Sequence, residues 1–252
     1  MTDTGLHVAT YNIHKGFSQF NRRMVVHDLR DRLRTLSPDL LFLQEVQGEH
    51  HHHAARHADW PTTAQHEFIA EDVWANSAYG RNVVYDHGHH GNAILSRHPL
   101  ADSHNQDVTD LAFERRGLLH TQMHLPGSAQ PIHCVCVHLS LLGRSRRRQL
   151  ELLAERLDHW APGDAPLIVA GDFNDWRNRA DPLFARKLGL SEAFGGESGR
   201  PVKSFPSAMP VFRLDRIYVR GFSVESARVH SGRPWSRISD HAALSAVLRP
   251  VA

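Results

Sequence analysis

The sequence predicts an α/β fold, because strand-like and helix-like segments alternate from one end of the chain to the other. Short apolar runs such as residues 40–44 and 132–137 are typical of buried strands. Apolar residues spaced three or four positions apart, as in residues 146–160, indicate helices with one buried face. The chain has 252 residues, 41% hydrophobic and 22% charged, so it can bury a core of its own, and we expect a single domain over residues 1–252.

The individual elements follow in order along the chain. Residues 6–11 predict the first strand, and Asn21 is a candidate N-cap for a helix that ends before Pro38. Ser145 is a candidate cap for the second helix. The His-rich segment 48–74 predicts an excursion on the surface. The remaining strands are expected at residues 40–44, 93–95, 132–137, 167–170, 214–219 and 243–248.

Charge and cysteine content restrict the class of protein. The formal net charge of +2 gives no strong nucleic-acid signature, although 21 histidines make the charge sensitive to acid. Cys134 and Cys136 alternate along one apolar strand, where they are badly placed for a disulfide, so we expect two buried thiols in a reducing compartment.

The tract His50–His53 lacks regular ligand spacing and predicts only adventitious metal binding. The polar residues 1–5 and the lack of a bilayer-length apolar run predict a soluble, cytoplasmic protein, and no obligate protein partner is evident.

The tetrad Gly171-Asp172-Phe173-Asn174 directly follows the apolar run 166–170. A strand that delivers a carboxylate and a carboxamide two residues apart contributes little to fold stability, but it suits the chemistry of a metal-bound phosphate. Turns of this kind are common, so the tetrad gains weight only from similar residues at the ends of other expected strands.

Two of those residues are candidate metal ligands. Glu45 ends an apolar run, where a carboxylate costs free energy unless it is paired or holds a cation. Asn12 follows the first strand and offers a hard oxygen of the kind that Mg²⁺ or Mn²⁺ prefers. The alternatives are a salt-bridged strand end for Glu45 and a turn residue for Asn12.

Two histidines and a carboxylate are candidates for proton transfer. Asp240 and His241 lie at the entrance to the last strand, and Asp215 lies among apolar neighbours, where it needs a cationic partner such as His241. His138 ends the strand that contains the two cysteines. The alternatives are a structural Asp–His hydrogen bond and a histidine satisfied within the core.

Cationic and amide side chains near these strand ends are candidates for substrate binding. An arginine cluster begins the second helix, where positive charge opposes the helix dipole, so it indicates either an anionic partner or a solvated basic face. The cluster consists of Arg144, Arg146, Arg147 and Arg148. Asn92 lies at the start of an expected strand, and Arg115 and Arg116 add two further cations.

Taken in order, these motifs resemble the endonuclease/exonuclease/phosphatase superfamily with the DNase I-like fold. Seven elements between residues 10 and 241 carry the resemblance: Thr10-Tyr11-Asn12, Leu43-Gln44-Glu45-Val46, Gly91-Asn92-Ala93-Ile94-Leu95-Ser96, Val137-His138-Leu139, Gly171-Asp172-Phe173-Asn174, Leu214-Asp215-Arg216-Ile217 and Ser239-Asp240-His241. The patterns Asn12-Ile13-His14-Lys15-Gly16 and Glu114-Arg115-Arg116-Gly117 resemble a compact bacterial subgroup.

The resemblance implies a four-layer α/β sandwich, with two mixed sheets packed face to face and helices outside. It also implies a bound Mg²⁺ or Mn²⁺, held by Glu45 with Asn12 and Asp240 in or near its shell. Asp172 would then orient and deprotonate the attacking water, and Asn174 would donate to the phosphoryl oxygens.

The histidines complete the implied site. His241, oriented by Asp215, would stabilise the transition state or move a proton, and His138 would serve the phosphate from the other side. One residue departs from the pattern, because abasic-site nucleases carry a carboxylate where this chain has His14. This difference weakens the abasic-endonuclease interpretation.

The resulting expectation is a hydrolase that cleaves a phosphoester, in particular a phosphodiester of a nucleic acid or a phospholipid, by in-line attack of water. Asn92, Arg116, Arg144 and Arg147 are the candidate substrate-binding residues. The arginines would suit a nucleic acid, and apolar residues between 205 and 212 would suit a lipid. The alternative is a non-catalytic binding module, and the intact set of candidate catalytic residues speaks against it.

Overall fold

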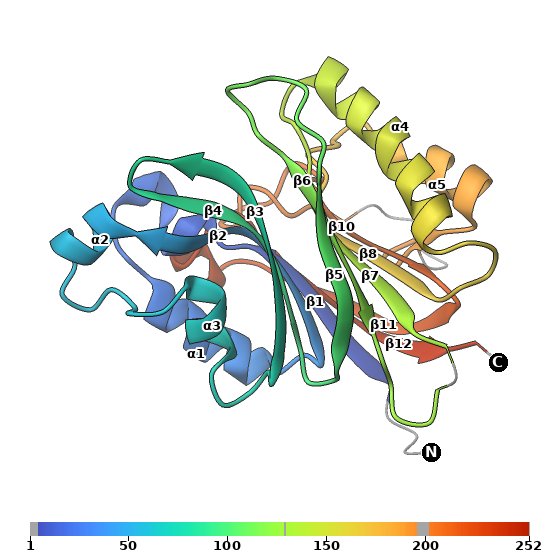
Figure 1. Ribbon diagram of the computed structural model, residues 1–252, viewed down its shortest axis with the longest axis horizontal. Helices are drawn as coiled ribbons and strands as arrows, with labels where there is room; N and C mark the ends of the chain where they lie inside the picture. The colour runs from blue at the N-terminus through green and yellow to red at the C-terminus, as the bar shows by residue number, and fades with distance from the viewer. Residues whose placement is uncertain (1–4, 129, 196–201, 252) are drawn as a thin grey trace.

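A computed structural model describes residues 5–128, 130–195 and 202–251 (Figure 1). The strands are β1 (Leu6–Asn12), β2 (Leu40–His50), β3 (Asn76–Tyr85), β4 (Gly88–Ser96), β5 (Leu100–Asp107), β6 (Gly117–Met123), β7 (Ile132–His138), β8 (Leu167–Asp172), β9 (Ser191–Glu192), β10 (Asp215–Arg220), β11 (Phe222–His230) and β12 (Ala243–Pro250). The α-helices are α1 (Val26–Leu36), α2 (His51–Arg56), α3 (Gln65–Ala70), α4 (Gly143–Trp160) and α5 (Ala180–Leu188). Three short 3-10 helices span His14–Gly16, Gln19–Asn21 and Trp235–Arg237.

The strands form two six-stranded sheets, in the orders β11-β12-β1-β2-β4-β3 and β5-β6-β7-β8-β10-β9. Each sheet contains one parallel pair, β1 with β2 and β7 with β8, and its other neighbours are antiparallel. A helix lies between the strands of each parallel pair in the chain, α1 in the first sheet and α4 in the second. This arrangement confirms the predicted α/β class with mixed sheets.

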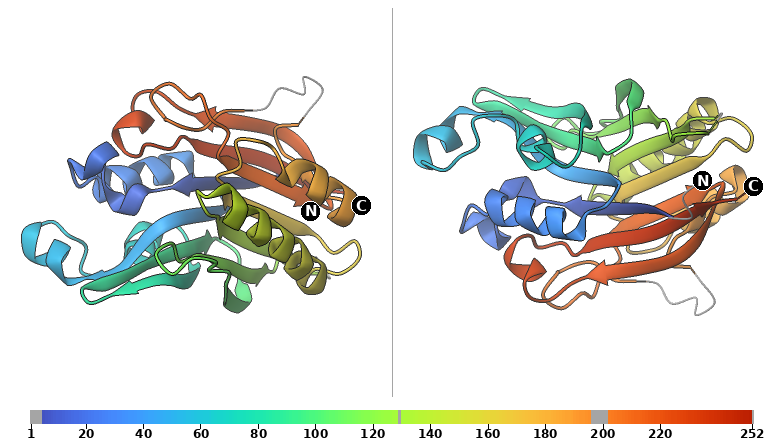
Figure 2. Two further views of the ribbon diagram at one scale, coloured as in Figure 1. Left: turned by 90° about the horizontal axis from the view of Figure 1, so that it is seen from above. Right: turned by 90° about the horizontal axis from the view of Figure 1, so that it is seen from below.

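The two sheets pack face to face, with helices on the two outer sides (Figure 1; Figure 2 gives the views from above and below). Strand β7 is largely apolar because both of its faces are buried. Cys134 and Cys136 point into the core between the sheets, whereas Val135 and Val137 pack in the core beneath α4 and α5. Both cysteines are buried and free, as expected from their spacing.

The parallel pairs bring the candidate residues together. Asn12 at the end of β1 lies beside Gln44 of β2, and His138 at the end of β7 lies opposite Asp172 at the end of β8. Asp215 at the start of the antiparallel strand β10 also lies opposite Asp172. The polar ends of strands from both sheets therefore meet at one edge of the sandwich.

Both predicted helix caps are wrong. Helix α1 begins at Val26 with Val25 at its N-cap position, so Asn21 does not cap it. Helix α4 begins at Gly143 rather than at residue 146, and the hydroxyl of Ser145 donates to Asp110 Oδ2 (2.6 Å) instead of capping the helix. The two helices start without side-chain caps because packing of their apolar faces stabilises them sufficiently.

Several elements were missed, and they are mostly strands with polar exposed faces. β5 and β11 carry alternating or largely polar residues, which gave no buried-strand signal. The segment 48–74 is not merely an excursion, because its helix α3 buries Ile69 and Ala70 against the first sheet. Among the described residues, no helix is long and apolar enough to cross a membrane.

Candidate active site

Asp172 lies at the centre of the polar cluster. Its side chain is buried at the end of β8, where Asn12 Nδ2 donates to Oδ2 (3.2 Å) and the backbone N–H of Asn174 donates to Oδ1 (2.9 Å). Burial raises the pKa of Asp172 to about 6, although the nearby charge of His241 opposes the increase. The carboxylate is therefore ionised near neutral pH and more basic than a solvent-exposed aspartate.

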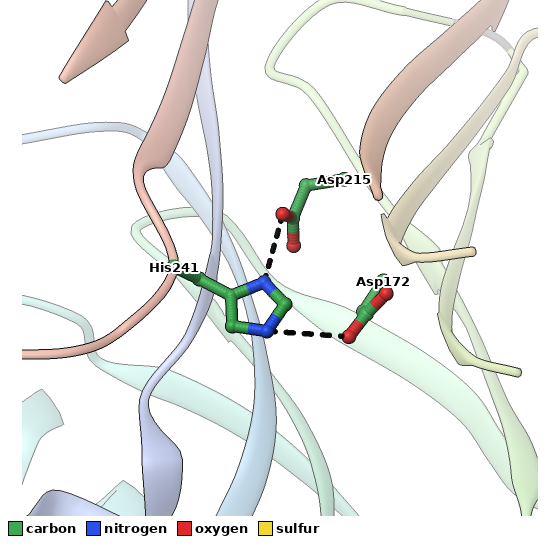
Figure 3. A group of neighbouring side chains, drawn as sticks. All are labelled: Asp172, Asp215 and His241. Carbon is green, nitrogen blue, oxygen red and sulfur yellow. Dashed lines mark hydrogen bonds and ion pairs between the residues drawn. The ribbon is translucent and has the colours of Figure 1, made fainter. Parts of the chain in front are cut away.

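Two imidazoles approach the same oxygen of Asp172. The distances to Asp172 Oδ2 are 3.6 Å from His138 Nε2 and 3.7 Å from His241 Nε2. On its other side, His241 Nδ1 lies 2.9 Å from Asp215 Oδ2, so its ring is clamped between two carboxylates (Figure 3).

The two histidines differ in charge. Burial alone would lower the pKa of His241, but the carboxylates of Asp215 and Asp172 outweigh it and raise the pKa to about 10. Burial lowers the pKa of His138 well below its ordinary value, and the positive charge of Arg116 adds to the effect. At neutral pH, Asp172 therefore faces one imidazolium and one neutral imidazole.

Asp215 is itself held in position by the segment before β10. The backbone N–H of Asp215 donates to Ser204 Oγ (3.1 Å), and the N–H of Leu214 donates to the same oxygen (3.2 Å). The ring of Phe205 packs on His241, with 5.0 Å between the ring centroids. These contacts restrict the His241 ring to one orientation.

A second carboxylate group lies around the turn after β1. Glu45 sits where the pairing of β2 with β4 shifts register, with a positive φ of 57°, and Asn12 Nδ2 donates to its Oε1 (3.4 Å). Asp240 Oδ1 lies 2.9 Å from His14 Nδ1, and the neighbouring Ser239 hydroxyl donates to the backbone oxygen of Asn12 (2.7 Å).

The donors of this second group are suited to a hard divalent cation. Glu45 and Asp240 offer carboxylate oxygens, the ligand type that Mg²⁺ and Mn²⁺ prefer. Asn12 turns its Nδ2 toward Glu45, while its Oδ1 accepts from the backbone N–H of His14 (3.1 Å), so in this structure it positions the carboxylate. Lys15 Nζ lies 3.9 Å from Glu45 Oε2 and is half-exposed, so it neutralises the carboxylate only weakly. The residues present therefore fit the metal ion that the sequence predicts.

The side chains of Asp172, Asp215 and His241 also lie close enough to share an ion, with one ligand atom from each within 4.8 Å of the others. However, a protonated imidazole has no lone pair for a metal, and the two carboxylates already neutralise its charge. This triad is better described as a charge-paired cluster than as a metal centre.

The loop after β7 is held by residues that the sequence analysis missed as a group. The Glu114 carboxylate accepts hydrogen bonds from the Ser140 hydroxyl, from the backbone N–H of Leu141 (2.9 Å) and from Arg116 Nη2 (3.0 Å). Arg116 Nε and Asn174 Nδ2 both donate to the carbonyl oxygen of Leu139, at 3.2 and 2.9 Å. The sequence analysis gave no role to Glu114 itself, whereas its carboxylate joins the loop before β6 to the loop that follows His138.

The candidate substrate-binding residues have different environments. Asn92 is buried and its Nδ2 donates to the carbonyl oxygen of Gly117 (3.0 Å), while its Oδ1 has no partner among the described residues. Arg116 is largely buried by the contacts given above. Arg144 and Arg147 are exposed.

The remaining arginines of the cluster and the histidine tract serve other purposes. Arg146 is buried, and its Nη1 donates to the carbonyl oxygens of Ser140 (2.9 Å) and Leu141 (2.8 Å). Arg148 pairs with Asp110 at 2.8 Å. The tract His50–His53 ends β2 and begins α2, where the ring of His53 packs with Phe17 and Trp60.

The family model for the "Endonuclease/Exonuclease/phosphatase family" matches residues 9–241, a range that contains every residue of the cluster. The chain belongs to this family. A curated relative from Escherichia coli K12, "Uncharacterized protein YbhP", is 46% identical over 239 residues, covering 95% of this chain and 94% of the relative.

Solved structures of other proteins show the same fold. The catalytic domain of human Nocturnin with a bound sulfate anion has a TM-score of 0.74 at 20% identity, covering 98% of this chain and 95% of that one. A mannosyl-6-phosphatase from Bacteroides thetaiotaomicron has a TM-score of 0.71 at 16% identity, covering 97% and 99%. At such low identities the likeness shows the DNase I-like fold of the family, not a shared substrate.

Proposed function

We propose that this single-domain member of the family is a divalent-metal-dependent hydrolase of phosphodiesters, with a nucleic acid or a phospholipid as substrate. The observation that supports it best is the buried Asp172 carboxylate, held between a cationic and a neutral imidazole. Such a pair of opposed environments is typical of a site that both removes and supplies protons.

Asp172 acts as the general base. Asn12 and the backbone of Asn174 orient its carboxylate, and its pKa of about 6 leaves it ionised at neutral pH yet basic enough to accept a proton from water. The water oxygen bonds to phosphorus while the bond to the leaving oxygen breaks in line, and the released water proton stays on Asp172.

His241 supplies positive charge opposite the base. Because Asp215 and Asp172 keep its ring protonated, its Nε2–H donates to a phosphoryl oxygen or passes a proton to the leaving oxygen. His138 is neutral and offers a hydrogen bond to the phosphoryl group from the other side. Asn174, placed by a positive φ of 49° and by its bond to Leu139, contributes a further amide donor.

Glu45 and Asp240 would hold Mg²⁺ or Mn²⁺, with Asn12 near its shell, and the ion when bound supplies positive charge that polarises the phosphoryl group. Asn92, Arg116, Arg144 and Arg147 are proposed to bind the remainder of the substrate. A non-catalytic binding module is less consistent with the cluster, because a binder gains nothing from a base with a raised pKa between two imidazoles.

The test is hydrolysis of plasmid DNA, single-stranded RNA, phospholipid vesicles and the generic diester bis(4-nitrophenyl) phosphate, each with Mg²⁺ or Mn²⁺. Asp172→Asn keeps the side-chain shape but removes the base, so turnover should fall by about 10²- to 10⁴-fold. Asp158→Asn, an exposed aspartate on α4, is the matched control and should retain full activity. Equal turnover by the wild type and Asp172→Asn would contradict the proposal.

A further inference from the structure

Large apolar side chains are exposed mainly at one end of the second sheet. Four loops meet there: residues 108–116 before β6, 139–142 after β7, 173–179 after β8 and 202–214 before β10. They share this end because β7 and β8 are parallel, whereas β6 and β10 run antiparallel to their neighbours. The same end of the sheet carries His138, Asp172 and Asp215. We call the four loops the end loops.

The end loops contain seven of the ten large hydrophobic side chains that are exposed among the described residues. Four of them are Phe113, Leu141, Leu142 and Trp176, with exposed fractions of 80%, 57%, 48% and 41%. A soluble surface disperses such side chains, so their concentration beside the catalytic cluster indicates a contact surface.

The other three lie in the segment 202–214, which leads into β10. Met209 is 73% exposed, and Val211 and Phe212 are also exposed. This segment contacts the site directly, because its Phe205 packs on His241 and the backbone N–H of Ser207 donates to the carbonyl oxygen of Asp240 (2.7 Å). Exposed apolar side chains are therefore carried by segments that border the catalytic cluster.

Hydrogen bonds hold the first three end loops in fixed positions. Glu114 links its loop to Ser140 and Leu141, and Arg146 binds the carbonyl oxygens of the same two residues. The guanidinium of Arg146 also lies 4.3 Å from the ring centroid of Trp176. The exposed side chains of these loops thus form a preorganised surface rather than a set of independent loop tips.

The exposed charges of the end loops are all positive. They are carried by Arg115, Arg177, Arg179 and Lys203. The acidic residues of these loops are paired or buried. Asp110 pairs with Arg148 and accepts a hydrogen bond from Ser145, Glu114 pairs with Arg116, and Asp175 is buried. Arg144 and Arg147 add exposed positive charge at the start of α4.

We infer that the end loops dock on an anionic phospholipid surface and present a lipid head group to Asp172. Exposed apolar side chains accompanied by exposed cations are suited to the boundary between head groups and acyl chains. A single-stranded nucleic acid would also use arginines and aromatic rings. However, Leu141, Leu142, Met209 and Val211 have no ring to stack on a base, and only an apolar phase rewards their burial. The inference rests on the proposed function only for the chemistry that follows docking.

The experiment is co-sedimentation with vesicles of equimolar phosphatidylglycerol and phosphatidylcholine, compared with vesicles of phosphatidylcholine alone. We expect the wild type to bind the anionic vesicles and the variant Leu141→Glu/Leu142→Glu to lose at least about tenfold in affinity. Met209→Glu/Phe212→Glu tests the segment 202–214 and should show the same loss. Because all four side chains are exposed, unchanged melting temperatures will show that each variant is folded.

The matched control is Val84→Glu/Val251→Glu, which changes two apolar residues of 63% exposure outside the end loops and should leave binding intact. Absence of wild-type binding, or equal losses in the control and in the end-loop variants, would overturn the inference. So would binding of a single-stranded oligonucleotide that the end-loop variants lose while vesicles do not bind. Sedimentation requires no turnover, so it remains informative even if Asp172→Asn shows that the proposed function is wrong.

Discussion

Two histidines that approach one oxygen of Asp172 have opposite charge states, and this difference organises the site. His241 is the more strongly paired, since Asp215 lies 2.9 Å from its Nδ1, whereas His138 is buried beside the positive charge of Arg116. Only one of the two rings around the Asp172 carboxylate is charged. The charged ring donates a hydrogen bond from one side, while the neutral ring adds no second positive charge that would further reduce the basicity of the carboxylate. The roles proposed for these residues follow from that asymmetry.

The pH dependence of activity tests the proposed base. A general base must be unprotonated, so activity is present above the pKa of Asp172, about 6, and is lost as the pH falls through it. We expect kcat/KM at saturating metal to fall about tenfold per pH unit in acid. The pKa of His241, about 10, places the alkaline limit well above neutrality.

The measurement is the pH profile of kcat/KM for the wild type and for Asp172→Asn. The residual rate of the variant should lack the acidic inflection. A wild-type profile that stays flat through pH values around 6 would contradict the assignment of Asp172 as the base.

Sequence reasoning worked well for residues at the ends of apolar strands. Asn12, Asp172, Asp215 and His241 were singled out because a polar group there needs a partner, and the structure brings them together. It failed for Arg146, which looked like part of a cationic surface but is buried by backbone contacts and Trp176. Those partners could not be inferred, because they depend on how two other loops fold over the helix.

At the scale of elements, the close contact between β7 and β8 places Asp172. Gly171 has a positive φ of 146°, and a Cβ added there would lie 2.0 Å from the carbonyl oxygen of Val137 in β7. Only glycine allows this approach, which keeps His138 opposite Asp172.

Gly171→Ala should therefore separate the two strands at the site. We expect a loss of about 2–4 kcal/mol in the free energy of unfolding, together with loss of activity. The control is Gly163→Ala, because Gly163 has a φ of 61° but open space around it, and it should cost about 1–2 kcal/mol without affecting kcat. The check is denaturant unfolding combined with turnover, and equal stability losses in the two variants would contradict the steric argument.

Elements were predictable where burial dominates. The central strands were located from their apolar runs, but β5 and β11 were missed because their sequences are polar enough to resemble loops. The cap assignments failed because the helices depend on tertiary packing rather than on local caps.

For the whole molecule, the two sheets contribute different parts of the site. The sheet of β1 and β2 carries Asn12 and Glu45, and the sheet of β7, β8 and β10 carries His138, Asp172 and Asp215. The α/β class was predictable from the alternation of strand-like and helix-like segments, and the family from the order of motifs along the chain. The meeting of the two sheets was implied only by the resemblance, because strand periodicity does not specify which faces pack together.

This division predicts where a metal ion binds. We propose that it lies with Glu45 and Asp240, whereas Asp215 serves only to hold His241. The competing location is the triad of Asp172, Asp215 and His241, whose ligand atoms are also close together. Substituting one residue of each group separates the two possibilities without any assay of turnover.

The most direct measurement is titration calorimetry of Mn²⁺ with the wild type, Glu45→Gln and Asp215→Asn. Both substitutions remove one charge and keep the side-chain shape. We predict that Glu45→Gln weakens Mn²⁺ binding at least about tenfold, since a direct ligand is lost, and that Asp215→Asn changes it little while reducing turnover. Loss of Mn²⁺ binding in Asp215→Asn with normal binding in Glu45→Gln would contradict the account, because it would place the metal in the buried triad and leave no free base there.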